Sequence, residues 1–168
     1  MLTSPKRILW PTDFSPLSLY GGRHARWLCE LFGSELHVVH VIAPPVAPDF
    51  SVALPAEIPI VYANDEVRQA CRARLAELVQ EHFAGLSDVV CEALFGSPWA
   101  TVCGYAEQAG IDLIVVATHG RTGLRHVLIG STAERIVQHA PCPVLVVKNP
   151  QKDFADPRRA APAANREP

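Results

Sequence analysis

The sequence predicts an α/β fold: an open, five-stranded parallel sheet with helices on both faces. Short apolar, β-branched segments alternate with helical patterns along most of the chain, and such alternation requires right-handed crossovers between parallel strands. One segment, residues 111–117, is a near-continuous apolar run, which is typical of a strand covered on both faces. The chain has 168 residues, 49% of them hydrophobic, which suffices for one globular domain with its own core.

The first strand, helix and second strand follow from local signals. Residues 7–10 and 36–42 are largely apolar and are expected to be strands. Between them, Ser15 supplies a helix N-cap, Pro16 the first helical residue, and Gly33 the left-handed residue that ends a helix. The apolar residues of this helix recur at helical spacing and are expected to face the sheet: Leu17, Tyr20, Trp27, Leu28 and Leu31.

The middle of the chain begins with residues 43–63, where five prolines exclude a regular element and predict a variable loop. A second helix is expected from residue 64 to a point before Gly85, and Val89–Phe95 is expected to be the third strand. The apolar stripe of this second helix consists of Val67, Cys71, Leu75, Leu78 and Val79.

The remaining elements complete the alternation. Ser97 and Pro98 repeat the capping pair and begin a third helix that ends at Gly110. The fourth strand at 111–117 is followed later by a helix at Ser131–His139 and a fifth strand at Val144–Val147. After residue 148 the composition turns to Pro, Ala, Arg and Asn, so residues 149–168 are expected to be a disordered tail and residues 1–148 the folded domain.

Composition and charge narrow the function classes. A formal net charge of −2, with no cluster of Lys and Arg among aromatics, argues against a nucleic-acid-binding surface. The apolar run near the N-terminus is too short for a signal peptide, and nowhere do about 18 apolar residues follow one another, which excludes a membrane span. The five cysteines are scattered without a C-x-x-C pair, which predicts reduced thiols rather than a zinc site or disulfides. A cytoplasmic protein is expected.

A glycine-spaced segment after the fourth strand predicts an anion site. It runs from Thr118-His119-Gly120-Arg121-Thr122-Gly123 to Gly130-Ser131-Thr132, where the last helix begins. Glycines let the backbone approach a ligand closely, and a helix N-terminus offers unpaired N–H groups. Three or four charge-assisted hydrogen bonds of about 1.5–3 kcal/mol each approach the roughly 8 kcal/mol of micromolar binding. The segment lacks the Gly-Lys-Ser/Thr of a P-loop, so the alternative is that the glycines only form a tight turn.

A carboxylate lies at the end of the first strand, in Pro11-Thr12-Asp13. Ligands of open α/β sheets bind at the carboxyl edge where the strand order reverses. With the order 3-2-1-4-5, the ends of strands one and four are neighbours, so that Asp13 and the glycine segment would face one crevice. The acid suits ribose hydroxyls and the loop suits phosphates. Alternatively, Asp13 caps a helix or forms a turn.

These residues resemble the universal stress protein family, specifically its ATP-binding branch, over residues 5–148. The family motif is Gly, two residues, Gly, nine residues, Gly and then Ser or Thr, which Gly120 and Gly130-Ser131 match. The resemblance implies a Rossmann-like, adenine nucleotide alpha hydrolase-like fold that binds ATP, with any Mg²⁺ carried by the phosphates. It implies that Asp13 holds the ribose and that Val41 meets the adenine through its backbone. The other residues implied to line the pocket or hold phosphates are Pro11, Thr12, Gly120, Gly130, Ser131 and Thr132, and His119 and Arg121 lie on the loop within reach of phosphates.

One position departs from the motif, because Ala117 stands where the first glycine is expected. If that residue must be left-handed, its Cβ costs about 1–2 kcal/mol, near tenfold in affinity. If its backbone is extended, the cost is only steric.

The resulting prediction is an ATP-binding regulatory module of the stress response. The base, metal clamp and phosphate-directed lysine of fast phosphoryl transfer are not evident, so enzymatic activity is expected to be slow ATP hydrolysis or phosphotransfer at most. A third possibility is a nucleotide-free interaction protein. Its basis is the apolar strand Val144–Val147, an edge that pairing with a second copy in a homodimer would cover.

Overall fold

The computed structural model describes residues 3–43, 65–118 and 130–148. Its parallel strands are β1 (Arg7–Pro11), β2 (Glu35–Ile42), β3 (Val89–Phe95), β4 (Leu113–Ala117) and β5 (Val144–Val147). Its helices are α1 (Pro16–Phe32), α2 (Asp65–His82), α3 (Pro98–Gln108) and α4 (Ser131–His139). The strand order β3-β2-β1-β4-β5 confirms the predicted topology. The predicted tail, and the predicted loop apart from Ala43, lie outside the described residues.

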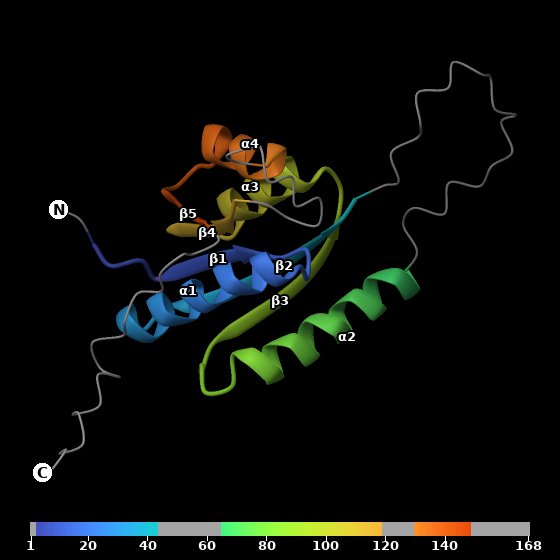
Figure 1. The fold of residues 1–168 in the computed structure, drawn as a ribbon, viewed down its shortest axis with the longest axis horizontal. Helices are drawn as coiled ribbons and strands as arrows, with labels where there is room; N and C mark the ends of the chain where they lie inside the picture. The colour runs from blue at the N-terminus through green and yellow to red at the C-terminus, as the bar shows by residue number, and fades with distance from the viewer. Residues whose placement is uncertain (1–2, 44–64, 119–129, 149–168) are drawn as a thin grey trace, which may run out of the picture.

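The helices cover the sheet in two layers, α1 and α2 on one face and α3 and α4 on the other (Figure 1). Alternate residues of each central strand enter opposite cores, as the pleat requires. Ile8 and Trp10 of β1 pack toward α1 and α2, whereas Leu9 packs toward α3 and α4, and all three are fully buried. Both faces are therefore apolar, which explains the near-continuous hydrophobic runs of the central strands.

The caps of α1 are those that the sequence predicts. The backbone N–H of Ser18 donates to Ser15 Oγ at 3.2 Å, Pro16 occupies the first turn, and Gly33 ends the helix at a left-handed φ of 67°. The corresponding Ser97-Pro98 pair at the start of α3 differs, because the Ser97 hydroxyl caps no backbone N–H there. Pro98 alone sets the helical start, since its fixed φ suits the first turn and its missing N–H is not needed there.

The buried face of α1 differs from the predicted stripe. Its buried residues include Gly21, Gly22 and Ala25, whereas Leu31 is 47% exposed. The cause is the size of Trp10 on β1: its indole lies so close to the helix that a Cβ at position 22 would approach it to 2.7 Å. The small residues on this face of α1 allow the helix to pack close to the sheet. On α2, Val67 from the predicted stripe is likewise 42% exposed.

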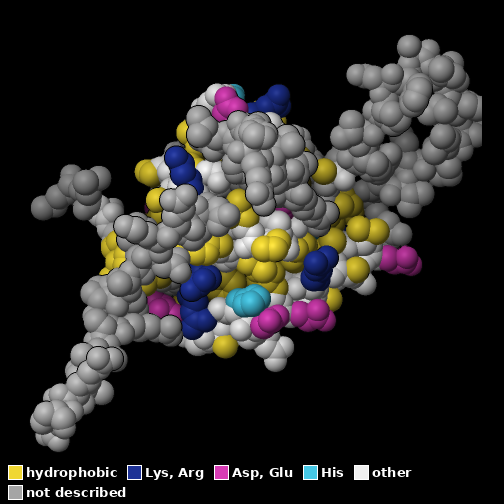
Figure 2. All heavy atoms as spheres, in the orientation of Figure 1, with side chains coloured by type: hydrophobic (Ala, Val, Ile, Leu, Met, Phe, Trp, Pro, Cys, Tyr) yellow, Lys and Arg dark blue, Asp and Glu magenta, His cyan; other side chains and the backbone are white. Residues whose placement is uncertain are grey.

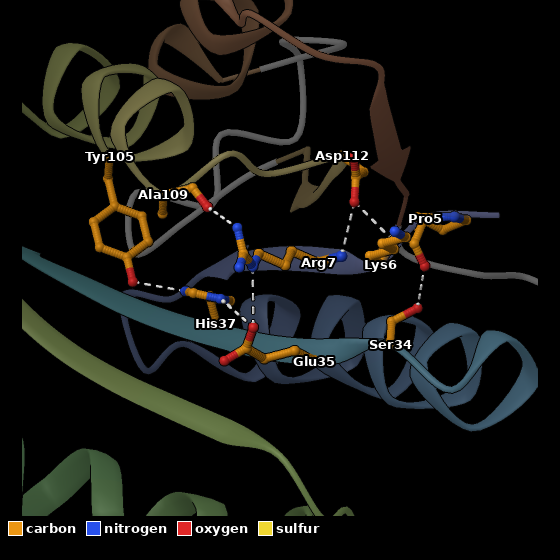
Figure 3. A network of polar contacts seen from close by, with 9 residues as sticks. All are labelled: Pro5, Lys6, Arg7, Ser34, Glu35, His37, Tyr105, Ala109 and Asp112. Carbon is orange, nitrogen blue, oxygen red and sulfur yellow. Dashed lines mark hydrogen bonds and ion pairs between the residues drawn. The ribbon is translucent and has the colours of Figure 1, made fainter. Parts of the chain in front are cut away.

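A polar network closes the amino edge of the sheet, opposite the strand ends where a ligand is expected (Figure 3). The backbone N–H groups of Lys6 and Arg7 donate to Asp112 Oδ2 at 2.7 and 2.9 Å, which ties the start of β1 to the turn before β4. Glu35 accepts from Arg7 Nε at 3.2 Å. No helix in the described part of the chain is both long and apolar enough to cross a membrane.

Candidate functional site

The candidate site lies at the carboxyl ends of β1 and β4, where the strand order reverses. β1 pairs with β2 as far as Pro11, opposite Val39, but its register with β4 extends only from Ile8 to Leu9. The two strands therefore separate toward their carboxyl ends. Such a divergence at a switch point is where open α/β sheets bind ligands.

Thr12 is held firmly at the end of β1. It is 5% exposed, and its backbone N–H donates to the carbonyl of Val39 at 2.8 Å. Its hydroxyl accepts from the N–H of Phe14 at 3.1 Å and contacts the Ser18 hydroxyl at 3.0 Å. The Thr12 carbonyl accepts from His40 Nδ1 at 2.8 Å. Thr12 thus positions the turn that carries Asp13 rather than presenting an open side chain.

Asp13 is partly buried in the turn between β1 and α1. One carboxylate oxygen, Oδ1, accepts from the backbone N–H of Ser15 at 3.0 Å, where Ser15 is the N-cap of α1. The turn-forming role that the sequence left open for this residue is therefore present.

Phe14, the next residue, has a left-handed φ of 63° and is the one non-glycine residue of the described chain with a positive φ. This conformation costs a bulky residue about 1–2 kcal/mol relative to the common regions. Its ring lies 4.5 Å from the His40 ring, and the Arg74 guanidinium carbon lies 4.3 Å from the Phe14 centroid. Backbone strain thus occurs immediately after the candidate ribose ligand.

Gly130 and Thr118 form the base of the glycine segment. The backbone N–H of Gly130 donates to the Thr118 carbonyl at 2.6 Å, and the Thr118 N–H donates to Val147 at 2.9 Å. The first bond anchors the start of α4 to the end of β4, and the second anchors the end of β4 to β5. Ser131 and Thr132 are exposed in the first turn of α4, whose N-cap is Gly130. His119, Gly120, Arg121 and Gly123 lie outside the described residues.

Ala117 is the last residue of β4 and has no left-handed φ. Of the two alternatives for this position, the extended backbone is therefore the one found. Ala117 is 8% exposed, and its methyl lies 3.6 Å from where a Cβ at Gly21 of α1 would stand. The methyl packs toward α1, where the absence of a side chain on Gly21 leaves space for it.

The expected adenine contact, Val41, lies near the end of β2 and is partly buried against the core under α3 and α4. Pro11 ends β1 on the neighbouring strand and is also partly buried. Sequence reasoning placed these residues at one edge but missed Phe14, His40 and Arg74. Arg74 comes from a helix 60 residues further along the chain, so no local pattern predicts its contact with Phe14.

Four of the five cysteines are buried or partly buried thiols with raised pKa values, and the described residues form no metal cluster. Burial raises the pKa of the Cys29 thiol to about 12 and raises the pKa values of Cys91, Cys103 and Cys142. Such thiols remain protonated and unreactive at neutral pH. Within residues 3–43, 65–118 and 130–148, no three His, Cys, Asp or Glu side chains gather around one metal position.

Figure 2 shows one face of the molecule. On this face, basic and acidic side chains lie among exposed hydrophobic side chains.

Comparison with known proteins places this geometry in context. The model of the universal stress protein family matches residues 5–148. Universal stress protein MJ0531 of Methanocaldococcus jannaschii is 35% identical over 148 residues, which cover 88% of this chain and 85% of that protein. The solved structure of universal stress protein UspA from Lactobacillus plantarum superimposes with a TM-score of 0.70 at 25% identity, covering 87% of this chain and 99% of that one. A universal stress protein solved in complex with cAMP has the same fold, with a TM-score of 0.61 at 20% identity over 86% of this chain and 98% of that chain.

Proposed function

The chain belongs to the universal stress protein family, and from that premise we propose that it is an ATP-binding regulatory module of the stress response. The nucleotide lies between Asp13 at the end of β1 and the glycine segment at the start of α4. Bound nucleotide changes the contacts that this segment makes with partner proteins. The solved relative in complex with cAMP supports an adenine nucleotide as the ligand class.

The observation that carries the proposal is the backbone of Gly130. Its φ of −69° and ψ of 150° are accessible to any residue, so conformation does not require a glycine there. A Ser or Asp would cap α4 at least as well, yet this helix begins without a side-chain cap. A glycine at such a helix start leaves room for a ligand, because the missing Cβ lets an anion approach the N–H groups of the first turn.

We assign the parts of ATP to residues at this helix start, in the glycine segment and at the ends of β1, β2 and β4. Gly130, Ser131 and Thr132 hold phosphates together with Gly120, and the loop residues Thr118, His119, Arg121 and Gly123 border them. Any Mg²⁺ is carried by these phosphates. Asp13 accepts hydrogen bonds from ribose hydroxyls, and Val41 contacts adenine through its backbone, with Pro11, Thr12 and Ala117 lining the pocket.

Acid-quenching the purified protein and separating the supernatant by anion-exchange chromatography tests this proposal, together with calorimetric titration of ATP. We expect co-purified adenine nucleotide or micromolar ATP binding that is lost in Gly130→Asp, which puts a negative charge at the phosphate position. If the wild-type protein contains no adenine nucleotide and binds no added ATP, the proposal is wrong and a nucleotide-free interaction module is favoured. Slow ADP release that disappears in both Gly130→Asp and Asp13→Ala would add hydrolysis to the function, whereas unchanged release would identify a contaminant.

A homodimer through β5 is the second part of the proposal. β5 is an edge strand of the sheet, made entirely of Val and Leu. Leu145 on this strand is 38% exposed and Val137 on α4 is 48% exposed. An open apolar edge favours pairing with another chain, and a two-fold dimer covers it without further growth. All five cysteines are free thiols, which fits a reducing, cytoplasmic location.

A further inference from the structure

Phe14 contacts two side chains from other parts of the fold, in addition to its place beside Asp13. The ring of His40, on β2, lies 4.5 Å from the Phe14 ring, centroid to centroid. The guanidinium carbon of Arg74, on α2, lies 4.3 Å from the Phe14 centroid, within the range of a cation–π contact. We call Phe14, His40 and Arg74 the Phe14 cluster.

The Phe14 cluster fixes both neighbours of Asp13. On one side, His40 Nδ1 donates to the Thr12 carbonyl at 2.8 Å. On the other side, the Phe14 N–H donates to the Thr12 hydroxyl at 3.1 Å, and the Ser15 N–H donates to Asp13 Oδ1 at 3.0 Å. The orientation of the Asp13 carboxylate therefore depends on the short turn from Thr12 to Ser15. Both Thr12 and Phe14, the residues on either side of Asp13, are held by contacts of the Phe14 cluster.

The left-handed backbone of Phe14 makes this turn dependent on the ring contacts. Its φ of 63° is one that bulky residues avoid, and a glycine would adopt it without strain. A phenylalanine persists at such a position only where its surroundings overdetermine the conformation. The contacts with His40 and Arg74 supply that restraint, and backbone strain of this kind gathers at ligand-binding sites.

Arg74 connects this turn to α2, a helix that packs mainly against β3 and β2. Only Leu75 and Leu78 of α2 are buried, and Arg72 Nη2 pairs with Glu92 on β3 at 2.6 Å. Arg74 instead reaches the turn between β1 and α1. The position of α2 on the sheet and the geometry at Asp13 are thus linked through the exposed side chain of Arg74.

We propose that Phe14 and Arg74 are positioning residues for the Asp13 carboxylate. Through Arg74, the position of α2 on the sheet regulates the affinity of the site for the ribose of a nucleotide. The inference rests on the proposed function, because it concerns the same site. Neither residue is assigned a contact with the nucleotide. Their effect is confined to the part of the ligand that Asp13 binds.

Calorimetric titration of the full chain with ATP and with 2′,3′-dideoxy-ATP, which lacks both ribose hydroxyls, tests the proposal. Arg74→Ala is expected to lower ATP affinity about two- to fivefold, the range of an exposed cation–π contact, and to leave the affinity for dideoxy-ATP unchanged. Arg68→Ala is the matched control, since Arg68 lies on the same helix and makes the same kind of contact, 5.1 Å from the Phe95 centroid. It is expected to change neither affinity.

Two further variants separate positioning from general support of the fold. Arg74→Lys retains a cation and is expected to restore most of the ATP affinity. In an Asp13→Asn background, Arg74→Ala is expected to have no additional effect, because the carboxylate that it positions is gone. Phe14→Leu, which keeps the apolar contact but removes the aromatic ring, should reproduce the selective loss of ATP affinity.

Distinct results overturn the inference and the proposed function. Equal losses for ATP and dideoxy-ATP in Arg74→Ala, or the same losses in Arg68→Ala, would show a merely structural role and overturn the inference while nucleotide binding stands. Additive losses in the Asp13→Asn background would overturn it as well. If the wild-type protein binds neither nucleotide, the proposed function itself fails, and the inference fails with it.

Discussion

Gly22 of α1 packs directly against the indole of Trp10 in β1. A Cβ at position 22 would lie 2.7 Å from the nearest indole atom, and Trp10 is fully buried, so the ring has no space to yield. We expect Gly22→Ala to lower the free energy of unfolding by about 1–3 kcal/mol through overpacking. Urea denaturation followed by circular dichroism measures this change.

Gly21 provides the control for that substitution on the same helix. A Cβ at position 21 would meet its nearest atoms, on Ala117, at an ordinary 3.6 Å. Gly21→Ala should therefore leave stability unchanged or raise it by about 0.5–1 kcal/mol, the gain of replacing a helical glycine. A similar loss of stability in both variants would contradict the close packing of Gly22 on Trp10.

These glycines also show what the sequence could and could not predict. The strands and helix starts follow from local patterns, such as the Ser15-Pro16 pair and the apolar runs, and the structure confirms them. The predicted strand order, which no local pattern specifies, is confirmed as well. The predicted apolar stripe of α1 is only partly right. Tyr20 and Leu28 pack against the core and Leu31 is exposed, but the helix's closest contact with the sheet uses glycines, which carry no hydrophobic signal. Its position depends on the size of Trp10 across the core.

The candidate site divides in the same way. The order of elements places Asp13 after the end of β1, and it places Gly130 at the start of α4, hydrogen-bonded to Thr118 after the neighbouring strand β4. The left-handed Phe14 and its contact with Arg74 depend on how α2 settles on the sheet. Such a tertiary contact across 60 residues leaves no trace in local sequence periodicity.

Arg26 is expected to stabilise the end of α2. Its guanidinium donates at 2.6 Å to the carbonyl of His82, an acceptor that the last turn of the helix leaves unpaired, and at 3.0 Å to the carbonyl of Ala84 in the turn that follows. Arg26→Ala should lower the free energy of unfolding by about 1 kcal/mol, and Arg26→Lys should not restore it, since a single ammonium does not reproduce the guanidinium fork. Urea denaturation measures both.

Glu30 supplies the comparison, because Arg26 also pairs with it along α1 at 2.8 Å. Glu30→Ala removes only this exposed pair and should cost about 0.3–0.5 kcal/mol. If Glu30→Ala and Arg26→Ala lose the same stability, the two carbonyl contacts contribute nothing.

Gly130→Ser is expected to separate stability from binding. The backbone conformation of Gly130 is accessible to any residue, and serine is an equal or better N-cap. The free energy of unfolding should therefore stay constant or rise by roughly a few tenths of a kcal/mol. ATP affinity should fall, because the new side chain enters the phosphate position. Thermal unfolding and calorimetry on the same samples measure the two quantities.

Gly33→Ser should show the opposite pattern. Gly33 ends α1 at a φ of 67°, where a Cβ is strained, so this variant should lose about 1 kcal/mol of stability and keep its ATP affinity. Unchanged ATP binding in Gly130→Ser would remove the main support for a phosphate at the start of α4.

Alkaline pH is expected to destabilise the protein through Cys29. Burial raises the pKa of this thiol from 9.0 to about 12, so the unfolded chain releases the proton at a lower pH than the folded chain does. Between these values the folded state binds more protons, and stability therefore decreases as pH rises; below pH 9 the contribution is fully present. Urea denaturation at a series of pH values should show this decline, and Cys29→Ala should make it shallower. An identical alkaline slope in the variant would assign the decline to other groups.

The β5 edge is expected to control the oligomeric state. Leu145→Lys places a charge on an exposed, apolar position of β5, and in a two-fold dimer it places like charges near each other. We expect the wild-type protein to have twice the monomer mass by light scattering, and Leu145→Lys to shift it to the monomer. Val67→Lys is the matched control, because Val67 is similarly exposed at 42% but lies on α2, away from β5, and should leave the dimer intact. A monomeric wild-type protein, or a dimer that Leu145→Lys does not weaken, would rule out pairing through this edge.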